Sequence, residues 1–221
     1  MRYTITMTVP ENPKIFHIVH VDHLASIVHD GGLFSDAVMS QRADDFGTKI
    51  GMQHIKERRM QAPVGGPAGG MVGEYVPFYF CPRSIMLYIM HMSDHPDITY
   101  RGGQAPIIHL VSDVAKATEW AAATSKPWAF SNTNAGAGYA EFFYDKAHLG
   151  ELRWDLIRLQ DFRPQQVKDA KQSEFLVKDT YPWELITGIA VYNEATKRQV
   201  EAIIKDAKHK PIVKVYKEWY Y

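Results

Sequence analysis

The feature that most constrains the fold is a series of short apolar segments, rich in β-branched or aromatic residues and bounded by Gly, Pro or polar residues. Segments of this length and composition predict buried β-strands. Helical patterns lie between some of them, so the chain is predicted to be a mixed α+β protein in which strands and helices neither alternate strictly nor segregate. The expected strands are residues 15–21, 75–80, 106–111, 174–177, 186–192 and 211–216, and the expected helices are residues 24–29, 50–60, 113–123, 149–159 and 194–207.

Two helix-start signals and one loop complete this outline. Asp22 and Asp113 stand where they would act as N-caps of the helices at 24–29 and 113–123. Residues 62–73 contain several Gly and Pro residues and are predicted to form a mobile surface loop. No repeat and no long linker divides the chain, so residues 1–221 are expected to form one domain.

Composition limits the classes of function. Lys plus Arg and Asp plus Glu are 25 each, so the formal net charge is zero and a polyanion would have to bind through a local patch. Cys81 is the single cysteine, which excludes intramolecular disulfides and a thiolate zinc cluster and fits a reducing compartment. No apolar run reaches the roughly 18 residues that span a bilayer, and residues 1–10 lack the apolar block of a signal peptide. A soluble, cytoplasmic protein is therefore expected.

Arg59 stands out in the helix predicted at 50–60. Met52, Ile55 and Arg59 fall at i, i+3 and i+7 and share one helical face, whereas Lys56 and Arg58 are expected to point to water. An arginine on an apolar face needs an anionic or planar partner, because an unpaired buried charge is costly. It either extends from a helix end to solvent or lines a pocket that receives a phosphate or a base edge.

Glu174 begins the strand predicted at 174–177. In an extended register Glu174 and Leu176 share one face, and Phe175 and Val177 share the other. A carboxylate at the mouth of an apolar strand suits holding a sugar hydroxyl or stabilising a developing cation. An ordinary surface glutamate at a strand end is the alternative.

Two further segments suggest ligand contacts. His17, His20 and His23 have a spacing that invites a metal hypothesis, but His17 and His20 face opposite sides of a strand, so no metal site is predicted. The segment 74–88 is dense in aromatic residues, and its Tyr75, Tyr79 and Met86 are candidate walls for a flat group, with a structural role for Cys81. No Walker, nucleophile-elbow or Rossmann glycine pattern is present.

Six short segments, spread over nearly the whole chain, carry a stronger signal together than any one of them alone. In this order they resemble the DarT family of DNA ADP-ribosyltransferase toxins. The resemblance implies a PARP-like ADP-ribosyltransferase fold, with a split, twisted β-core that cradles NAD. The segments are Phe-His-Ile-Val-His at 16–20, Ile-Lys-Glu-Arg-Arg at 55–59, Tyr-Val-Pro-Phe-Tyr-Phe-Cys-Pro-Arg-Ser at 75–84, Pro-Ile-Ile-His-Leu-Val-Ser at 106–112, Gln-Ser-Glu-Phe-Leu-Val at 172–177 and Trp-Tyr-Tyr at 219–221.

Position by position, the resemblance implies that Glu174 and Arg59 are the two catalytic residues. The helix that ends near Arg59 would close over NAD, and residues 128–174 would form the loop that presents DNA. Residues 131–135 replace a charged stretch with histidine that some relatives carry, so the preferred flanking bases stay open. The expected NAD contacts, including the aromatic and Met walls, are His17, Ile18, Val19, Ser26, Phe34, Arg59, Tyr79 and Met86.

The activity implied is transfer of ADP-ribose from NAD, the substrate, to thymine N3 in single-stranded DNA. The protein would act sequence-specifically as a toxin, neutralised by a macrodomain antitoxin of the DarG type. Arg59 favours thymine, because the exocyclic amine of guanine, the alternative acceptor, needs no loss of a ring proton. Two other readings stay open: a catalytically idle nucleotide- or nucleic-acid-binding module, and a histidine-coordinated metal hydrolase.

Overall fold

The computed structural model describes residues 9–42 and 47–221 and is organised around a large mixed β-sheet. This sheet has eight strands in the order β10-β9-β4-β1-β3-β7-β5-β6, and β2 and β8 form a second, small sheet. The strands are β1 (Lys14–His20), β2 (Gly32–Phe34), β3 (Tyr75–Tyr79), β4 (Ile107–Asp113), β5 (Trp128–Ser131), β6 (Phe142–Phe143), β7 (Glu174–Lys178), β8 (Thr180–Pro182), β9 (Gly188–Val191) and β10 (Ile212–Val215).

The large sheet is held together unevenly at its centre. β1 pairs with β4 over its whole length, but it pairs with β3 at a single position, Phe16 opposite Tyr79. The strands on either side of this junction therefore diverge, which gives the split β-core that the resemblance implied. The divergence leaves β1 residues from His17 onward without strand partners on the β3 side, and their side chains become available to a ligand.

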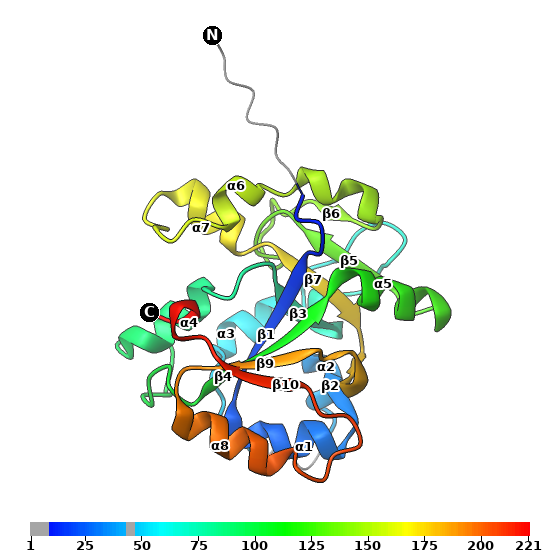
Figure 1. The fold of residues 1–221 in the computed structure, drawn as a ribbon. Coiled ribbons are helices and arrows are strands. Elements are labelled where there is room, and N and C mark those ends of the chain that lie inside the picture. The colour runs from blue at the N-terminus through cyan, green and yellow to red at the C-terminus, as the bar shows by residue number, and fades with distance from the viewer. Residues whose placement is uncertain (1–8, 43–46) are drawn as a thin grey trace.

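Helices flank the sheet and close its ends. Figure 1 shows α1 and α8 together at one end of the molecule and α6 and α7 at the other, with the C-terminus near α4. The helices are α1 (Leu24–His29), α2 (Asp36–Met39), α3 (Gln53–Arg59), α4 (Ile85–Met92), α5 (Val114–Ala123), α6 (Trp154–Ile157), α7 (Gln165–Lys171) and α8 (Glu194–Ile203).

Most of the predicted elements are present. All six predicted strands form, with small shifts at their ends, and so do the helices expected at 24–29, 50–60, 113–123 and 194–207. The helix expected at 149–159 is wrong as a single element, because a 3-10 segment, Lys146–Glu151, and the short α6 share that stretch. The α+β fold class is confirmed.

Neither predicted aspartate cap makes a capping hydrogen bond. A 3-10 turn, Val21–His23, moves the start of α1, and the Asp22 carboxylate instead accepts hydrogen bonds from the backbone and hydroxyl of Thr48, at 3.1 and 2.6 Å. Asp113 does stand at the start of α5, but its side chain forms an ion pair with Lys14.

The Gly- and Pro-rich segment at 62–73 forms a loop, as predicted, but it is packed against the protein. Val64 and Val72 are buried, and Pro63 pairs with Met71 as an isolated bridge. The hydroxyl of Tyr75 donates to the carbonyls of Ala68 and Gly69, at 2.9 and 2.6 Å. Tyr75 therefore anchors this loop and does not serve as a wall for a ligand, contrary to the prediction.

Several elements had no clear signal in the sequence. The strand β2 is three residues long and exists only because β8, nearly 150 residues further on, pairs with it. The helix α4 is apolar over most of its surface and shows no polar face, so its sequence lacks the alternation of apolar and polar residues that marks an amphipathic helix. Its start did carry a signal: Ser84 accepts a hydrogen bond from the Leu87 amide at 3.2 Å, as an N-cap residue does.

His109 on β4 is a titratable residue in the core of the protein. Its ring is fully buried, with Nε2 2.8 Å from the carbonyl of Pro82. Burial lowers the pKa of His109 from its ordinary value of 6.5 to about 4. The unfolded chain therefore takes up a proton between pH 6.5 and 4 that the folded protein does not.

This difference predicts the acid stability of the protein. Because the unfolded state binds the extra proton, the free energy of unfolding is insensitive to His109 above pH 6.5 and falls by up to ~3 kcal/mol as the pH drops to 4. Urea denaturation at pH 7 and pH 4.5 measures this loss. His109→Asn is expected to reduce the pH dependence, and the exposed His29→Asn is the control that keeps it. An unchanged slope in the folded His109→Asn protein would contradict the assignment.

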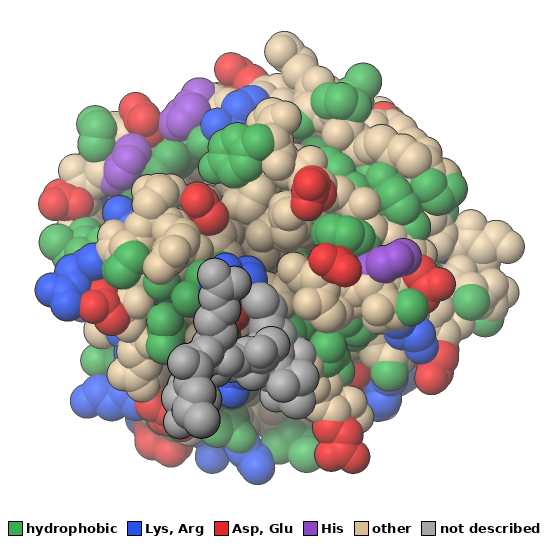
Figure 2. All heavy atoms as spheres, turned by 90° about the horizontal axis from the view of Figure 1, so that it is seen from above, with side chains coloured by type: hydrophobic (Ala, Val, Ile, Leu, Met, Phe, Trp, Pro, Cys, Tyr) green, Lys and Arg blue, Asp and Glu red, His purple; other side chains and the backbone are tan. Residues whose placement is uncertain are grey.

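The surface agrees with the zero net charge. On the face shown in Figure 2, outside the grey atoms, Lys and Arg side chains are interspersed with Asp and Glu side chains. No helix within residues 9–42 and 47–221 is long and apolar enough to cross a bilayer. The prediction that residues 1–10 carry no signal peptide concerns a segment that lies mostly outside the described residues.

Candidate active site

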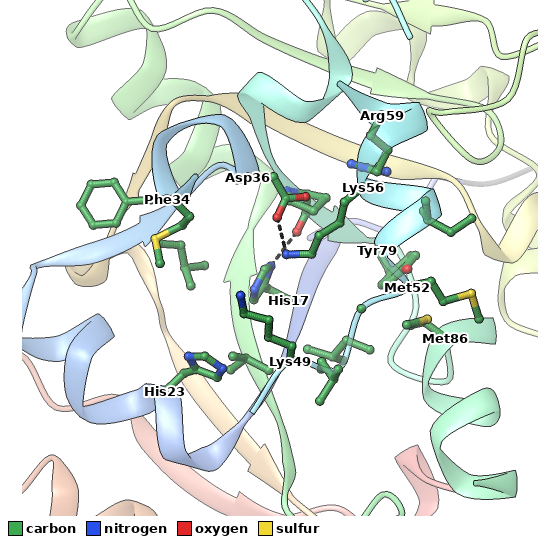
Figure 3. Close-up of a pocket in the computed structure, with 18 of the residues that line it drawn as sticks. His17, His23, Phe34, Asp36, Lys49, Met52, Lys56, Arg59, Tyr79 and Met86 are labelled. Carbon is green, nitrogen blue, oxygen red and sulfur yellow. Dashed lines mark hydrogen bonds and ion pairs between the residues drawn. The ribbon is translucent and has the colours of Figure 1, made fainter. Parts of the chain in front are cut away.

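A cavity of about 390 Å³ opens where β1 and β3 diverge. The side chains in Figure 3 converge on it from β1, from α3 and from the segments around α2 and α4. Its lining combines apolar side chains with polar and charged groups from several elements, as in sites that bind an organic ligand. Position and lining both make this cavity the candidate active site.

The residues that the sequence singled out meet at this cavity. They come from seven helices and strands that are far apart in the chain, and the fold brings all of them to the wall of one cavity. The predicted residues that line the cavity are His17, Ile18, Val19, Ser26, Phe34, Arg59, Tyr79, Met86 and Glu174.

An ion pair between Arg59 and Glu174 lies at the centre of the polar wall. Nη1 of Arg59 donates to both carboxylate oxygens of Glu174, at 3.0 and 2.9 Å. The backbone N–H of Ala135 donates to Oε1 of the same carboxylate at 3.0 Å. Both side chains are almost completely buried, with 9% and 3% of their surface exposed. The two groups therefore share one site, as the sequence argument required.

The helix α3 aims Arg59 at the carboxylate. Met52, Ile55 and Arg59 all line the cavity, which confirms the predicted helical face. The expectation that Lys56 points to water is wrong, because it lines the cavity as well and pairs with Asp36, Nζ to Oδ1, at 2.7 Å. The long lysine side chain extends from α3 to this acid, which lies at the start of α2 (Figure 3).

The electrostatics of the pair keep Arg59 charged. Burial alone would lower the pKa of Arg59, but the charge of Glu174 and the hydrogen bond to it outweigh burial and raise that pKa. Burial, and then the charge of Glu174, also raise the pKa of Tyr79, which remains a neutral phenol in the cavity wall. Nη2 of Arg59 is buried and has no hydrogen-bond partner among the described residues. An oriented donor is therefore free beside the Arg59–Glu174 pair.

His17 presents a defined face to the cavity. Its Nδ1 lies 2.8 Å from the carbonyl oxygen of Pro77 on β3. A carbonyl can only accept, so Nδ1 carries the proton, and Nε2 of the neutral ring is left as an acceptor. Burial lowers the pKa of His17 and keeps the ring neutral near pH 7. This arrangement suits a histidine that accepts a hydrogen bond from a hydroxyl or an amide of a ligand.

The segment around 131–135 contacts the Glu174 carboxylate through Ala135 and the cavity through Asn134. Asn134 lines the cavity and donates to Gln172, another lining residue, at 3.3 Å. The prediction that residues 128–174 form a single DNA-presenting loop is wrong, because β5, β6, α6 and α7 occupy much of that range. Before Glu174 itself, the parts of this range that reach the cavity are the short turn around 131–135 and the end of α7.

Sequence reasoning missed part of the lining. Lys56 and Gln172 lie inside segments that carried the family resemblance, and Asn134 lies in the stretch noted at 131–135, so a signal was present for these. Asp36 and Lys49 had none, because they reach the cavity only through the placement of α2 and of the chain before α3. Cys81 is buried outside this cavity, and burial raises the pKa of its thiol, in keeping with a structural role.

A metal centre finds no support in the geometry. Among the described residues, no three His, Cys, Asp or Glu side chains are grouped so that they could hold an ion. His20 and His23 instead lie beside the carboxylate of Asp22. Nδ1 of His20 is 2.8 Å from its Oδ1, and Nε2 of His23 is 3.8 Å from the same atom. The cavity residues themselves are suited to an organic ligand.

The sequence matches the family described as "ssDNA thymidine ADP-ribosyltransferase, DarT" over residues 16–221. A "DNA ADP-ribosyl transferase" of Thermus sp. (strain 2.9) is 38% identical over 219 residues, which cover 97% of this chain and 99% of that relative. The fold is similar to that of Thermus sp. 2.9 DarT in complex with ADP-ribosylated ssDNA, with a TM-score of 0.89 and 35% identity over 98% of this chain and 100% of the other. The complex of the same protein with NAD+ gives a TM-score of 0.82 and 34% identity over 97% and 100%.

Proposed function

This chain belongs to the DarT family of DNA ADP-ribosyltransferases, and from that membership we propose that it transfers ADP-ribose from NAD to N3 of thymidine in single-stranded DNA, in a sequence-specific manner. The family description names thymidine and ssDNA, and the similar Thermus structures hold NAD+ and ADP-ribosylated ssDNA. One domain, residues 1–221, would bind both substrates.

The observation that carries the proposal is the convergence of Arg59 and Glu174 in one cavity. Glu174 lies on β7 and Arg59 on α3, 115 residues apart, and their side chains are joined by two hydrogen bonds of 3.0 and 2.9 Å. A carboxylate for a cationic transition state and a fixed cation for an anionic acceptor are the two groups that this transfer needs.

Glu174 would promote cleavage of NAD. Breaking the bond between ribose C1′ and the nicotinamide nitrogen releases neutral nicotinamide and builds positive charge on the ribose. A carboxylate beside that ribose stabilises the oxocarbenium-like transition state more than the ground state, so it raises the rate. The amide of Ala135, which donates to Oε1 at 3.0 Å, would hold the carboxylate in position.

Arg59 would prepare the acceptor. Thymine N3 is a poor nucleophile while it carries its proton, so the proton must leave to water as the N3–C1′ bond to ribose forms. Arginine is effectively always charged and cannot serve as an ordinary base. Its unpartnered Nη2 can donate to an oxygen beside N3 and stabilise the negative charge that develops on the ring.

The requirement for a single strand follows from the acceptor atom. N3 of thymine lies in the base-pairing edge and is hidden in a duplex, so a duplex substrate would have to be opened first. Asn134 and the turn at 131–135 lie at the cavity wall next to the catalytic pair. We propose that this turn contacts the bases beside the target and contributes to the sequence preference.

A base adduct that blocks the pairing edge would be toxic to a cell that makes it. We therefore propose, on the resemblance to the DarT family, that the protein is the toxin of a toxin–antitoxin pair. The partner would be a macrodomain of the DarG type that removes ADP-ribose from DNA.

One incubation tests the substrate directly. A random-sequence single-stranded pool that contains all four bases is treated with NAD and the protein, digested to nucleosides and analysed by mass spectrometry. The expected product is thymidine carrying one ADP-ribose, with nicotinamide released in equal amount and no adduct in the same pool annealed to its complement. An adduct on deoxyguanosine, or none at all, would contradict the proposal.

A further inference from the structure

A second cavity, of about 680 Å³, lies outside the candidate active site. It differs from the first in its lining, which combines aromatic rings with several cationic side chains. The lining residues that matter here are Phe16, Arg83, Trp154, Arg158, Lys171 and Trp219.

Two thin walls separate the cavities. Tyr79 lines the catalytic cavity, and the next residue, Phe80, lines the second. In the same way Gln172 lines the first and its neighbour Lys171 lines the second. The thiol of Cys81 lies 3.7 Å from the Lys171 carbonyl and so connects the two walls. The second cavity is therefore built against the segment that leads into Glu174.

Within the described part of the chain, its cations have no acidic partners. Lys171 is 2% exposed, and its ammonium group donates to the carbonyls of Ile157 and Leu159, both at 2.9 Å, and also interacts with the thiol of Cys81. Nε of Arg83 is buried without a hydrogen-bond partner in the described part of the chain. Arg158 is exposed and, among the described residues, donates only to the Trp154 carbonyl, at 3.1 Å. Arg83 and Arg158 therefore have donors to spare for an anionic ligand.

The remaining charges of the cavity do not cancel this excess. Lys14 forms an ion pair with Asp113, so the two charges cancel. Glu218 is the single acid of the lining, and it lies exposed at the rim. Three cations therefore face one exposed carboxylate in a protein whose total charge is zero.

The aromatic residues add a surface for a flat group. Trp219 stacks on Tyr216 with ring centroids 4.3 Å apart and an angle of 8° between the planes, and Phe16 meets Trp219 edge to face at 5.3 Å. The contacts hold the Trp219 ring in place, while the residue stays only partly buried. Proteins that bind single-stranded nucleic acids use rigid aromatic rings to stack on the bases and neighbouring cations to contact the phosphates.

We propose that the second cavity binds a nucleotide of the DNA strand that flanks the modified base, with its phosphate held by Arg83 and Arg158 near the buried charge of Lys171 and its base against Trp219. This inference rests on the proposed function for the identity of the strand. It explains how a protein without net positive charge holds a polyanion: the cations are concentrated next to the catalytic cavity and not spread over the surface. The flanking contact would add affinity without touching the reacting base.

The test removes two cations and compares the result with a variant of equal charge. Arg83→Gln/Arg158→Gln and the control Arg163→Gln/Arg198→Gln each lose two positive charges, and the control residues line neither cavity. Fluorescence anisotropy measures the affinity of each protein for a labelled dA decamer without NAD, at several salt concentrations. The first variant is expected to bind about tenfold more weakly than the control, with the slope of log K against log salt reduced by about 0.7, which corresponds to the loss of one phosphate contact. Its affinity for NAD is expected to equal that of the wild-type protein.

The outcomes separate this inference from the proposed function. Equal decamer binding by the two variants, or an equal loss of NAD affinity, would overturn the cavity assignment even if thymidine is modified. If the Arg83→Gln/Arg158→Gln variant binds free dAMP more weakly but binds the decamer normally, the assignment is also overturned, since the ligand would then be a free nucleotide. A selective tenfold loss with the decamer supports the cavity, even if the nucleoside analysis finds no ADP-ribosylated thymidine and the proposed function fails.

Discussion

Replacing Glu174 by Gln is expected to lower the rate of ADP-ribose transfer by about a thousandfold while the protein stays folded. The amide keeps the size of the carboxylate, and its oxygen can still accept hydrogen bonds from Arg59 and from the Ala135 amide, both of which lie 3.0 Å from Oε1 in the wild-type protein. Its NH2 group, however, replaces the second oxygen that Arg59 contacts at 2.9 Å and leaves the buried guanidinium without a counter-charge, so we expect the free energy of unfolding to fall by about 3–5 kcal/mol as well. The amide also cannot supply the negative charge that the cationic transition state requires. Loss of one such electrostatic contact in a closed site costs roughly 100- to 1000-fold in rate, and a full charge lies at the upper end of that range.

The measurement is single-turnover labelling of a thymine-containing oligonucleotide with NAD, together with NAD affinity by calorimetry. Affinity is expected to change little, because the lost interaction belongs to the transition state. The matched control is Glu201→Gln, an exposed position on α8 that is expected to keep wild-type turnover. Normal turnover by a folded Glu174→Gln protein would remove Glu174 from catalysis.

Replacing Arg59 is expected to have two separable effects. Arg59→Ala leaves the Glu174 carboxylate buried and unpaired, so we expect the free energy of unfolding to fall by about 3–5 kcal/mol, together with loss of transfer to thymine. Arg59→Lys keeps the positive charge and should fold well. A lysine lacks the second, forked donor, so the group corresponding to Nη2 is missing and transfer is expected to fall about 100-fold.

Arg59→Lys is therefore the informative variant. Chemical denaturation gives its stability, calorimetry its NAD affinity, which is expected to be largely retained, and single-turnover labelling its rate. Arg58→Lys, on the exposed side of the same helix, is the control for any general effect of lysine in α3. Undiminished labelling by Arg59→Lys would show that a point charge suffices, and undiminished labelling by a folded Arg59→Ala would exclude Arg59 from the chemistry.

Much of the candidate site was visible in the sequence because two local patterns have strong physical reasons. Helical periodicity places Met52, Ile55 and Arg59 on one face, and an arginine on such a face needs a partner in the interior. Alternation along β7 separates Glu174 from Phe175, whose ring is buried in the core. The other contacts followed from the resemblance of six segments to a known family and not from patterning.

The α+β class and the principal strands and helices can be predicted from the sequence, as can Arg59 and Glu174 as candidates, because these depend on periodicities of two and 3.6 residues along the chain. The three-dimensional packing was needed to show that Arg59 and Glu174 are buried partners of each other, that Lys56 pairs with Asp36, and that Lys171 and Arg83 line a second cavity. These outcomes depend on where β1 and β3 separate and on contacts between residues 20 to 115 positions apart. Local patterns carry no information about such distances, since side chains at long separation meet only after the whole sheet has formed.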